Sequence, residues 1–131
     1  MTIGIGATFK HSWSISQSQL DEFAHLSGDR NLLHTDGDYA KSHGFKDKVV
    51  HGALILAKVS EFIGMKLPYK DVVWLYSNVI FSNPLYLNEE VELSGSLTAY
   101  SAAVSTVELN IRIISGESQI CSGKIGLKVL R

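Results

Sequence analysis

Apolar residues recur with helical spacing in the first half of this chain and with strand spacing in the second half. Phe9 to Ile15 alternates apolar and polar residues, which predicts a short first strand. Residues 16–19, Ser-Gln-Ser-Gln, match a capping box, and Ile15 and Leu20 flank it as a hydrophobic staple does. The pattern therefore predicts a helix that begins at about Gln17 and stops at Gly28.

Two further helices are expected before residue 70. Residues 36–43 predict a short helix that ends at Gly44, and residues 49–65 predict a longer one, followed by Pro68. The longer helix is apolar on nearly every side, which is typical of a helix buried in the middle of a fold.

The few polar residues of this long helix fall on two sides. His51, Lys58 and Glu61 lie within ~80° of one another at ~100° per residue, so we expect one narrow polar stripe facing an interface or solvent. Ser60 points ~180° away from His51. Its hydroxyl is therefore expected to be buried and to need a hydrogen-bond partner.

From residue 72 onward the chain is rich in β-branched and aromatic residues, which predicts four strands. The expected ranges are 72–81, 91–100, 104–114 and 120–130, separated by short turn sequences at meander spacing. The predicted fold class is α+β, with one antiparallel β-sheet wrapped around the central α-helix. No internal repeat or linker divides the sequence, so we expect a single domain over residues 1–131.

Composition narrows the class of protein further. The chain has 131 residues, 45% of them hydrophobic, and a formal net charge of −1, so no basic surface for nucleic acid is expected. The longest apolar run, residues 53–57, is far too short to span a membrane. Cys121 is the only cysteine and the first residues lack a secretory pattern, which favours a cytoplasmic protein.

The most informative segment carries a carboxylate, an amide and an imidazole within six residues. Asp29, Asn31 and His34 lie here, and no hydrophobic period organises them. Asp29 and His34 would point ~140° apart on a straight helix, but a turn after Gly28 can bring them together. An adjacent carboxylate and imidazole can hold and activate one water molecule.

Other common chemistries have no pattern here. The five histidines include no His-x-x-x-His pair, and there is no Cys/His cluster, so we predict no metal site. A glycine-rich phosphate loop and a Gly-x-Ser-x-Gly elbow are also missing from the sequence. We predict no cofactor, because activating a water needs only the Asp/His pair.

Several motifs follow one another in a recognisable order. Phe-Ala-His-Leu-Ser-Gly-Asp-Arg-Asn-Leu-Leu-His ends at His34, Val-His-Gly ends at Gly52, and Phe81-x-x-Pro84 precedes the later strands. In this order they resemble the MaoC-like, or (R)-specific, enoyl-CoA hydratases, whose fold is called the hot dog. The resemblance covers residues 9–130. Leu32 departs from it, because the family usually has proline there.

The resemblance implies a role for each matching residue. Asp29 and His34 would jointly hold the catalytic water, and Asn31 would support their loop. Gly52 would donate its backbone N–H to the thioester oxygen of the substrate, where a helix N-terminus favours developing negative charge. Ser60 would orient Asp29 or His34 as a supporting residue.

The expected activity is the reversible addition of water to trans-2-enoyl thioesters, which gives (R)-3-hydroxyacyl thioesters. The substrate would be linked to coenzyme A or to an acyl carrier protein, and the resemblance implies a homodimer. Two alternatives stay open. A hot-dog thioesterase would need an acidic residue in the central helix, for which Glu61 is the only candidate. A non-catalytic acyl-binding subunit has Leu32 as its support.

Overall fold

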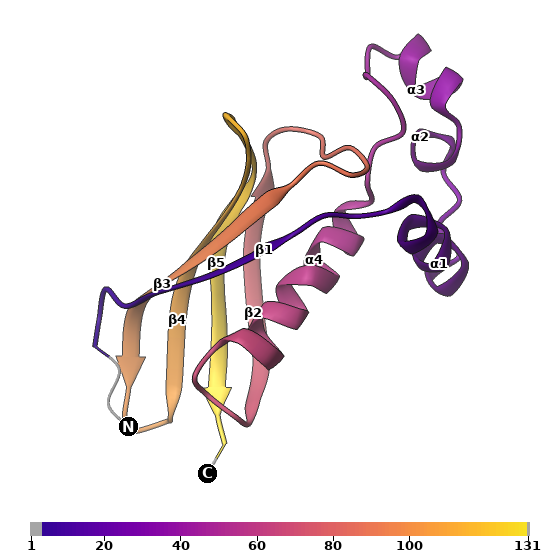
Figure 1. Cartoon of the computed structure of the whole chain (residues 1–131). Helices are drawn as coiled ribbons and strands as arrows, with labels where there is room; N and C mark the ends of the chain where they lie inside the picture. The colour runs from indigo at the N-terminus through magenta and orange to yellow at the C-terminus, as the bar shows by residue number, and fades with distance from the viewer. Residues whose placement is uncertain (1–3, 131) are drawn as a thin grey trace.

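One antiparallel sheet carries a helix along one of its faces, and three more helices gather beyond the N-terminal end of that helix (Figure 1). The computed structural model describes residues 4–130. The strands are β1 (Thr8–Trp13), β2 (Val72–Phe81), β3 (Val91–Ser101), β4 (Thr106–Ser115) and β5 (Ser118–Val129). The helices are α1 (Gln17–Ser27), α2 (Leu32–Thr35), α3 (Gly37–Ser42) and α4 (Gly52–Glu61), and the π-helical turn η1 (Phe62–Lys66) extends α4. No helix within residues 4–130 has the length and apolar character needed to cross a membrane.

The five strands pair in the order β1-β3-β4-β5-β2, all antiparallel, so β1 and β2 are the two edges. Alternate residues of the central strands point to the helix side and are buried. On β3 and β4 these are Val91, Leu93, Gly95, Leu97, Val107, Leu109, Ile111 and Ile113. The side-chain period of two seen in the sequence therefore produces the apolar face against which α4 packs.

Phe62 connects the helix to the middle of this sheet. Its side chain is fully buried, and its ring lies directly over Gly95 of β3. A Cβ atom at position 95 would come within 2.9 Å of the ring, so only glycine permits this close approach. The core thus holds the C-terminal end of α4 firmly against the sheet.

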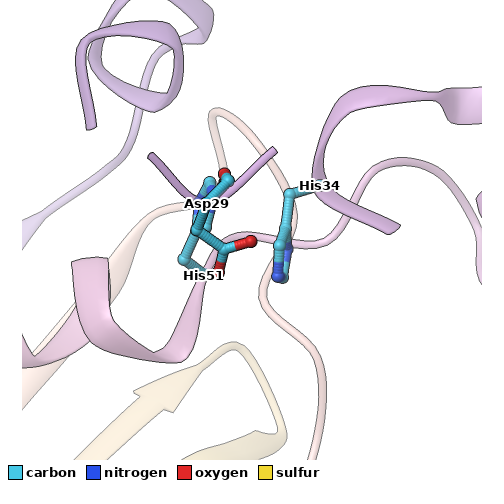
Figure 2. A group of neighbouring side chains, drawn as sticks. All are labelled: Asp29, His34 and His51. Carbon is cyan, nitrogen blue, oxygen red and sulfur yellow. The ribbon is translucent and has the colours of Figure 1, made fainter. Parts of the chain in front are cut away.

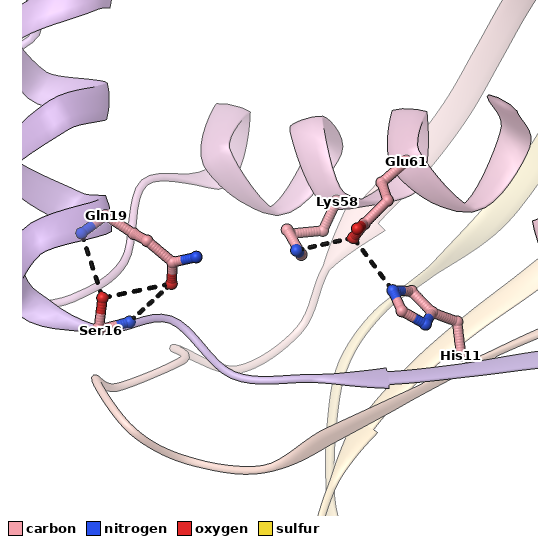
Figure 3. Close-up of polar contacts among 5 residues, drawn as sticks. All are labelled: His11, Ser16, Gln19, Lys58 and Glu61. Carbon is pink, nitrogen blue, oxygen red and sulfur yellow. Dashed lines mark hydrogen bonds and ion pairs between the residues drawn. The ribbon is translucent and has the colours of Figure 1, made fainter. Parts of the chain in front are cut away.

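The predicted start of α1 is confirmed. The backbone N–H of Gln19 donates to the Ser16 hydroxyl at 3.2 Å, and the Gln19 side chain accepts from the Ser16 N–H at 2.9 Å (Figure 3). The two residues form a complete capping box, and α1 begins at Gln17 as predicted.

The central helix is shorter than predicted. The sequence predicts helix from residue 49 to 65, but α4 begins at Gly52 and gives way to the π-helical turn after Glu61. The backbone N–H groups of Val49 and Val50 donate to the carbonyls of Leu33 and Leu85. Those two residues therefore belong to an extended segment that connects neighbouring loops, in spite of their apolar side chains.

The predicted orientation of the polar stripe on this helix is wrong. Lys58 and Glu61 lie against β1, where the Glu61 carboxylate accepts from the Lys58 ammonium at 2.7 Å and contacts His11 Nε2 at 3.0 Å (Figure 3). The Lys58 ammonium also lies 5.8 Å from the Trp13 ring. Because these charges neutralise one another and the lysine stem covers an aromatic ring, the stripe is partly buried.

The exposed side of α4 and η1 carries small residues instead. These are Ala53, Ala57, Ser60 and Gly64, which return every three or four positions along one line of the helix. The prediction that the Ser60 hydroxyl is buried is therefore wrong within this chain. The helix is apolar on nearly every side, so its pattern specified poorly which side faces the sheet.

Candidate active site

The turn expected after Gly28 is present and places Asp29 at the start of an exposed loop. Gly28 ends α1 in the left-handed region, with φ of 77°, and its N–H donates to the Ala24 carbonyl at 2.9 Å. Glycine adopts this conformation without a steric cost. The backbone N–H of Asp29 then donates to the Ser27 hydroxyl at 3.1 Å.

Asn31 joins the Asp29 loop to the helix that carries His34. Its side-chain oxygen accepts from the Leu33 N–H at 3.1 Å and so caps α2. Its own backbone N–H donates to a carboxylate oxygen of Asp29, also at 3.1 Å. These two hydrogen bonds link the Asp29 carboxylate to α2.

His34 extends from α2 with one ring nitrogen already occupied. Its Nδ1 lies 2.6 Å from the carbonyl oxygen of Val49. A carbonyl oxygen can only accept, so Nδ1 carries the ring proton and Nε2 keeps a free lone pair. An imidazole held in this way can take a proton from a neighbouring water.

The structure brings the side chains of Asp29 and His34 together. The ligand-type atoms of Asp29, His34 and His51 all lie within 4.8 Å of one another. Figure 2 shows a carboxylate oxygen of Asp29 directed toward the His34 ring. A water with two hydrogen bonds of ~2.8 Å bridges atoms ~4.5 Å apart, so Asp29 and His34 lie within the range that one water can bridge.

His51 is the unexpected third member of this group. The sequence placed it on a polar stripe facing an interface or solvent, but it is 1% exposed. Its Nε2 lies 2.9 Å from the backbone carbonyl of Asp29, and its ring stacks on His34 with centroids 4.0 Å apart. The Val-His-Gly motif indicated that this residue belongs to the site. The helical projection misplaced it because His51 precedes α4 and therefore lies on none of its faces.

The same three side chains are the described residues that could in principle hold a metal ion. A metal bound to an imidazole nitrogen lies in the plane of the ring. The His34 and His51 rings are stacked with only 25° between their planes, so their lone pairs run side by side and do not converge. The arrangement suits a water between Asp29 and His34 better than a metal.

Gly52 is the first residue of α4 and lies beside the same group. Within the described part of the chain no side chain caps this helix, because the side chain of its N-cap residue, His51, turns to Asp29. A cavity of about 390 Å³ opens here, lined by His34, Gly52 and mainly apolar side chains. The N-terminus of α4, with its N–H groups and positive dipole end, therefore lies beside an apolar cavity that also contains His34.

Phe81 covers Gly52, a contact that no local pattern in the chain predicts. A Cβ atom at position 52 would come within 3.2 Å of the Phe81 ring, which also lines the cavity. The Phe81-x-x-Pro84 turn thus forms one wall of the site. Position 52 has little room for any side chain.

Two of the predicted candidates lie away from this group. Ser60 is exposed and eight residues beyond Gly52, which is ~12 Å along the helix. Glu61, the acidic candidate for a thioesterase, is held by Lys58 and His11. These hydrogen bonds keep the pKa of the Glu61 carboxyl below its usual range, so it is a weak base as well as a distant one.

Comparison with known proteins agrees with the motifs. The family model described as MaoC like domain matches residues 2–114. The (R)-specific enoyl-CoA hydratase of Aeromonas caviae is 28% identical over 114 residues, which cover 87% of this chain and 85% of that protein. The mitochondrial 3-hydroxyacyl-(acyl-carrier-protein) dehydratase of Arabidopsis thaliana is 26% identical over 87 residues, 66% of this chain but only 51% of the relative.

The solved structures agree as well. An (R)-hydratase from A. caviae involved in PHA biosynthesis superimposes with a TM-score of 0.91, at 27% identity and over 98% of both chains. This likeness confirms the predicted fold, a hot-dog fold in which an antiparallel five-stranded sheet packs around a central helix. Since the family model matches most of its length, the chain belongs to the MaoC-like family.

Proposed function

We propose that this protein is a hydratase/dehydratase that adds water reversibly to trans-2-enoyl thioesters and gives (R)-3-hydroxyacyl thioesters. The observation that carries the proposal is the hydrogen bond from His34 Nδ1 to the Val49 carbonyl. It leaves Nε2 with a free lone pair on a ring that lies close to Asp29 and that lines the same cavity as Gly52 at the N-terminus of α4. A water-activating pair and an oxyanion donor are the two groups that this hydration needs.

In the hydration direction each group has one task. Asp29 and His34 hold the water, whose oxygen forms a bond to C3 of the enoyl group while His34 Nε2 takes one of its protons. The electrons of the C2=C3 double bond move toward the thioester oxygen, and the Gly52 N–H stabilises the resulting enolate. The proton then passes from the site to C2, so that H and OH are added across the double bond. No oxidant, reductant or cofactor enters this balance.

The relatives support an acyl thioester as the substrate, but they differ in the carrier to which the acyl group is linked. One named relative is a hydratase of enoyl-CoA, and another is a dehydratase of acyl-carrier-protein thioesters. The (R) configuration in our proposal rests on the name of the A. caviae relative, an (R)-specific hydratase, and on the family resemblance of the segment that carries Asp29 and His34. Both carriers present the same thioester to the site.

The test compares loss of the enoyl group with release of free thiol from C4 to C12 trans-2-enoyl-CoA. We expect the enoyl absorbance to fall with no thiol released, and chiral analysis to find the (R)-3-hydroxyacyl product. Thiol release at a comparable rate would support a thioesterase instead. Absence of both reactions, with enoyl-CoA and with the acyl-carrier-protein thioester, would leave a non-catalytic acyl-binding subunit.

We further propose that the functional unit is a homodimer joined along β2. This strand is an edge of the sheet, and large apolar side chains on it are exposed: Ile80 is 69% exposed, Leu75 49% and Tyr76 48%. An edge of this kind is a template for pairing with another strand. A second copy related by a two-fold axis would pair β2 with β2. It would also cover the exposed small residues of α4 and η1, which are Ala53, Ala57, Ser60 and Gly64.

Sedimentation equilibrium at micromolar concentration tests the dimer. We expect twice the chain mass of 14.4 kDa. Ile80→Lys should shift the protein toward the monomer, because a charge on the edge disfavours pairing. Thr8→Lys places the same charge on the opposite edge, β1, and should leave the dimer intact. A wild-type protein that is monomeric and active would contradict this proposal.

A further inference from the structure

We infer that His51 is a positioning residue for the two water-binding side chains, those of Asp29 and His34. It holds Asp29 by a hydrogen bond to the Asp29 backbone and His34 by stacking on the His34 ring. This inference rests on the proposed function, in which Asp29 and His34 bind the catalytic water. It concerns a residue that the reaction above does not use. His51 is 1% exposed and contacts both the Asp29 backbone and the His34 ring, with which it is grouped in Figure 2.

The first contact anchors the loop. His51 Nε2 lies 2.9 Å from the backbone carbonyl of Asp29, which can only accept, so Nε2 carries the proton and donates it. Residues 27–32 are all exposed and have little packing of their own. A hydrogen bond from a buried side chain therefore fixes the Asp29 backbone to the interior of the protein.

The second contact supports the base. The His51 ring stacks on the His34 ring, with centroids 4.0 Å apart. Phe23 of α1 meets the His51 ring edge-on, with centroids 5.0 Å apart. His34 is thereby held by Val49 through its Nδ1 and by His51 across its face. Two independent contacts leave its Nε2 with one orientation.

The position of His51 in the chain connects these contacts to the third group of the site. It is the N-cap residue of α4, directly before Gly52, yet its side chain makes no capping hydrogen bond to its own helix. A shift of His51 would move the Asp29 loop, the His34 ring and the first N–H of α4 relative to one another. One buried residue thus sets the spacing of all three.

The chemistry of the ring indicates why an imidazole stands here. The Nδ1 atom of His51 is buried, and it has no hydrogen-bond partner among residues 4–130. Burying an unpaired polar atom costs ~1–3 kcal/mol, whereas phenylalanine would fill the same space without that cost. What the imidazole provides and phenylalanine lacks is the hydrogen bond to the Asp29 carbonyl.

Two variants separate the hydrogen bond from the ring. His51→Phe keeps a flat ring on His34 but removes the donor, and His51→Gln keeps an N–H near the Nε2 position but removes the ring. For loss of a hydrogen bond that orients a reacting group we expect His51→Phe to lower kcat ~10- to 100-fold with KM changed less than ~3-fold. His51→Gln loses only the stacking contact, and Val49 still holds His34 through its Nδ1, so kcat should stay within ~5-fold of wild type at equal or lower Tm.

A readout without substrate separates this inference from the proposed function. In His51→Phe, NMR hydrogen exchange at the Asn31 amide should accelerate at least ~10-fold, since that amide donates to the Asp29 carboxylate, while the Leu20 amide of α1 stays unchanged. Wild-type kcat in His51→Phe, an equal loss in both variants, or unchanged exchange at Asn31 would overturn the positioning role. A wild-type protein without hydration activity would instead overturn the proposed function, and the exchange result would still stand.

Discussion

The Nδ1 atom of His34 donates its proton to the carbonyl oxygen of Val49, 2.6 Å away in the segment that leads into α4. This single contact joins α2 to the N-terminal side of the central helix. It also fixes which nitrogen of the ring is basic, because a carbonyl cannot donate in return. The structural and the chemical contributions of His34 therefore lie on different ring nitrogens and can be separated by substitution.

His34→Asn should lower kcat for enoyl thioester hydration at least ~10²-fold while keeping the protein folded. An asparagine amide can still donate to the Val49 carbonyl from the Nδ1 position, but it has no basic lone pair at the Nε2 position. His34→Ala removes both and should lose stability as well as activity. Steady-state kinetics and thermal unfolding distinguish the two variants. Near-wild-type kcat in His34→Asn would contradict a role for Nε2.

Leu32→Pro should stabilise the protein by ~0.4–1 kcal/mol without lowering its activity. Leu32 is the first residue of α2, where proline is favoured, and Asn31 before it has φ of −52° and ψ of 134°, which proline accepts. Leu33→Pro is the matched control, because it removes the N–H that donates to the Asn31 side chain. Denaturant unfolding should give opposite signs for the two variants. A loss of stability in Leu32→Pro would show that the loop has another conformation.

Glu61→Gln should weaken the dependence of stability on acid pH and leave hydration within ~3-fold of wild type. The Lys58 ammonium and the His11 ring hold the Glu61 pKa below its usual range, so the folded state binds a proton less readily than the unfolded state. The stabilisation is present above the unfolded pKa, and it is lost as the pH falls through the folded one. Its size is at most ~1 kcal/mol, because the side chain is 40% exposed to screening solvent.

Chemical unfolding at pH 7 and at about pH 3 measures this difference. If the acid-induced loss of unfolding free energy is as large in Glu61→Gln as in the wild type, the ion pair does not contribute as described. Thiol release from an acyl-CoA by the wild type that disappears in this variant would revive the thioesterase alternative, for which this carboxylate was the candidate.

Cys121 should resist thiol reagents while the protein is folded. It lies on β5 with no exposed surface, and burial raises its pKa to about 11. At pH 8 only on the order of one thiol in a thousand is then the reactive thiolate, before burial limits access further. Reaction with a disulfide reagent should be at least ~10²-fold slower than in denaturant. Rapid labelling of the native protein would indicate that β5 opens locally.

Local signals predicted the parts of this fold that depend on neighbouring residues. Ser16 and Gln19 form their capping box within one turn, and Gly28 adopts its left-handed turn whatever packs around it. The strand ranges followed from runs of β-branched and aromatic residues between turn sequences, and β2 spans residues 72–81 as predicted. The meeting of Asp29 and His34 also followed from the turn at Gly28, because only five residues separate them.

The orientation of the central helix depended on contacts that the sequence does not encode locally. Ser60 was placed inside and His51 outside, and the structure reverses both. A helix with apolar residues on nearly every side has no single face to identify. The charged Lys58 and Glu61 were therefore assigned to an interface or to solvent, although β1 supplies them with His11 and Trp13. The four-residue helix α2 was missed because it is too short to show a period.

A double-mutant cycle on hydration tests the central claim, that Asp29 and His34 act on one shared water. Asp29→Asn and His34→Asn should each lower kcat at least ~10²-fold. Because either change already removes the activated water, the double variant should be little slower than the worse single variant. Losses that multiply, so that the double variant falls by the product of the two single effects, would mean that the side chains act independently and would contradict the shared water.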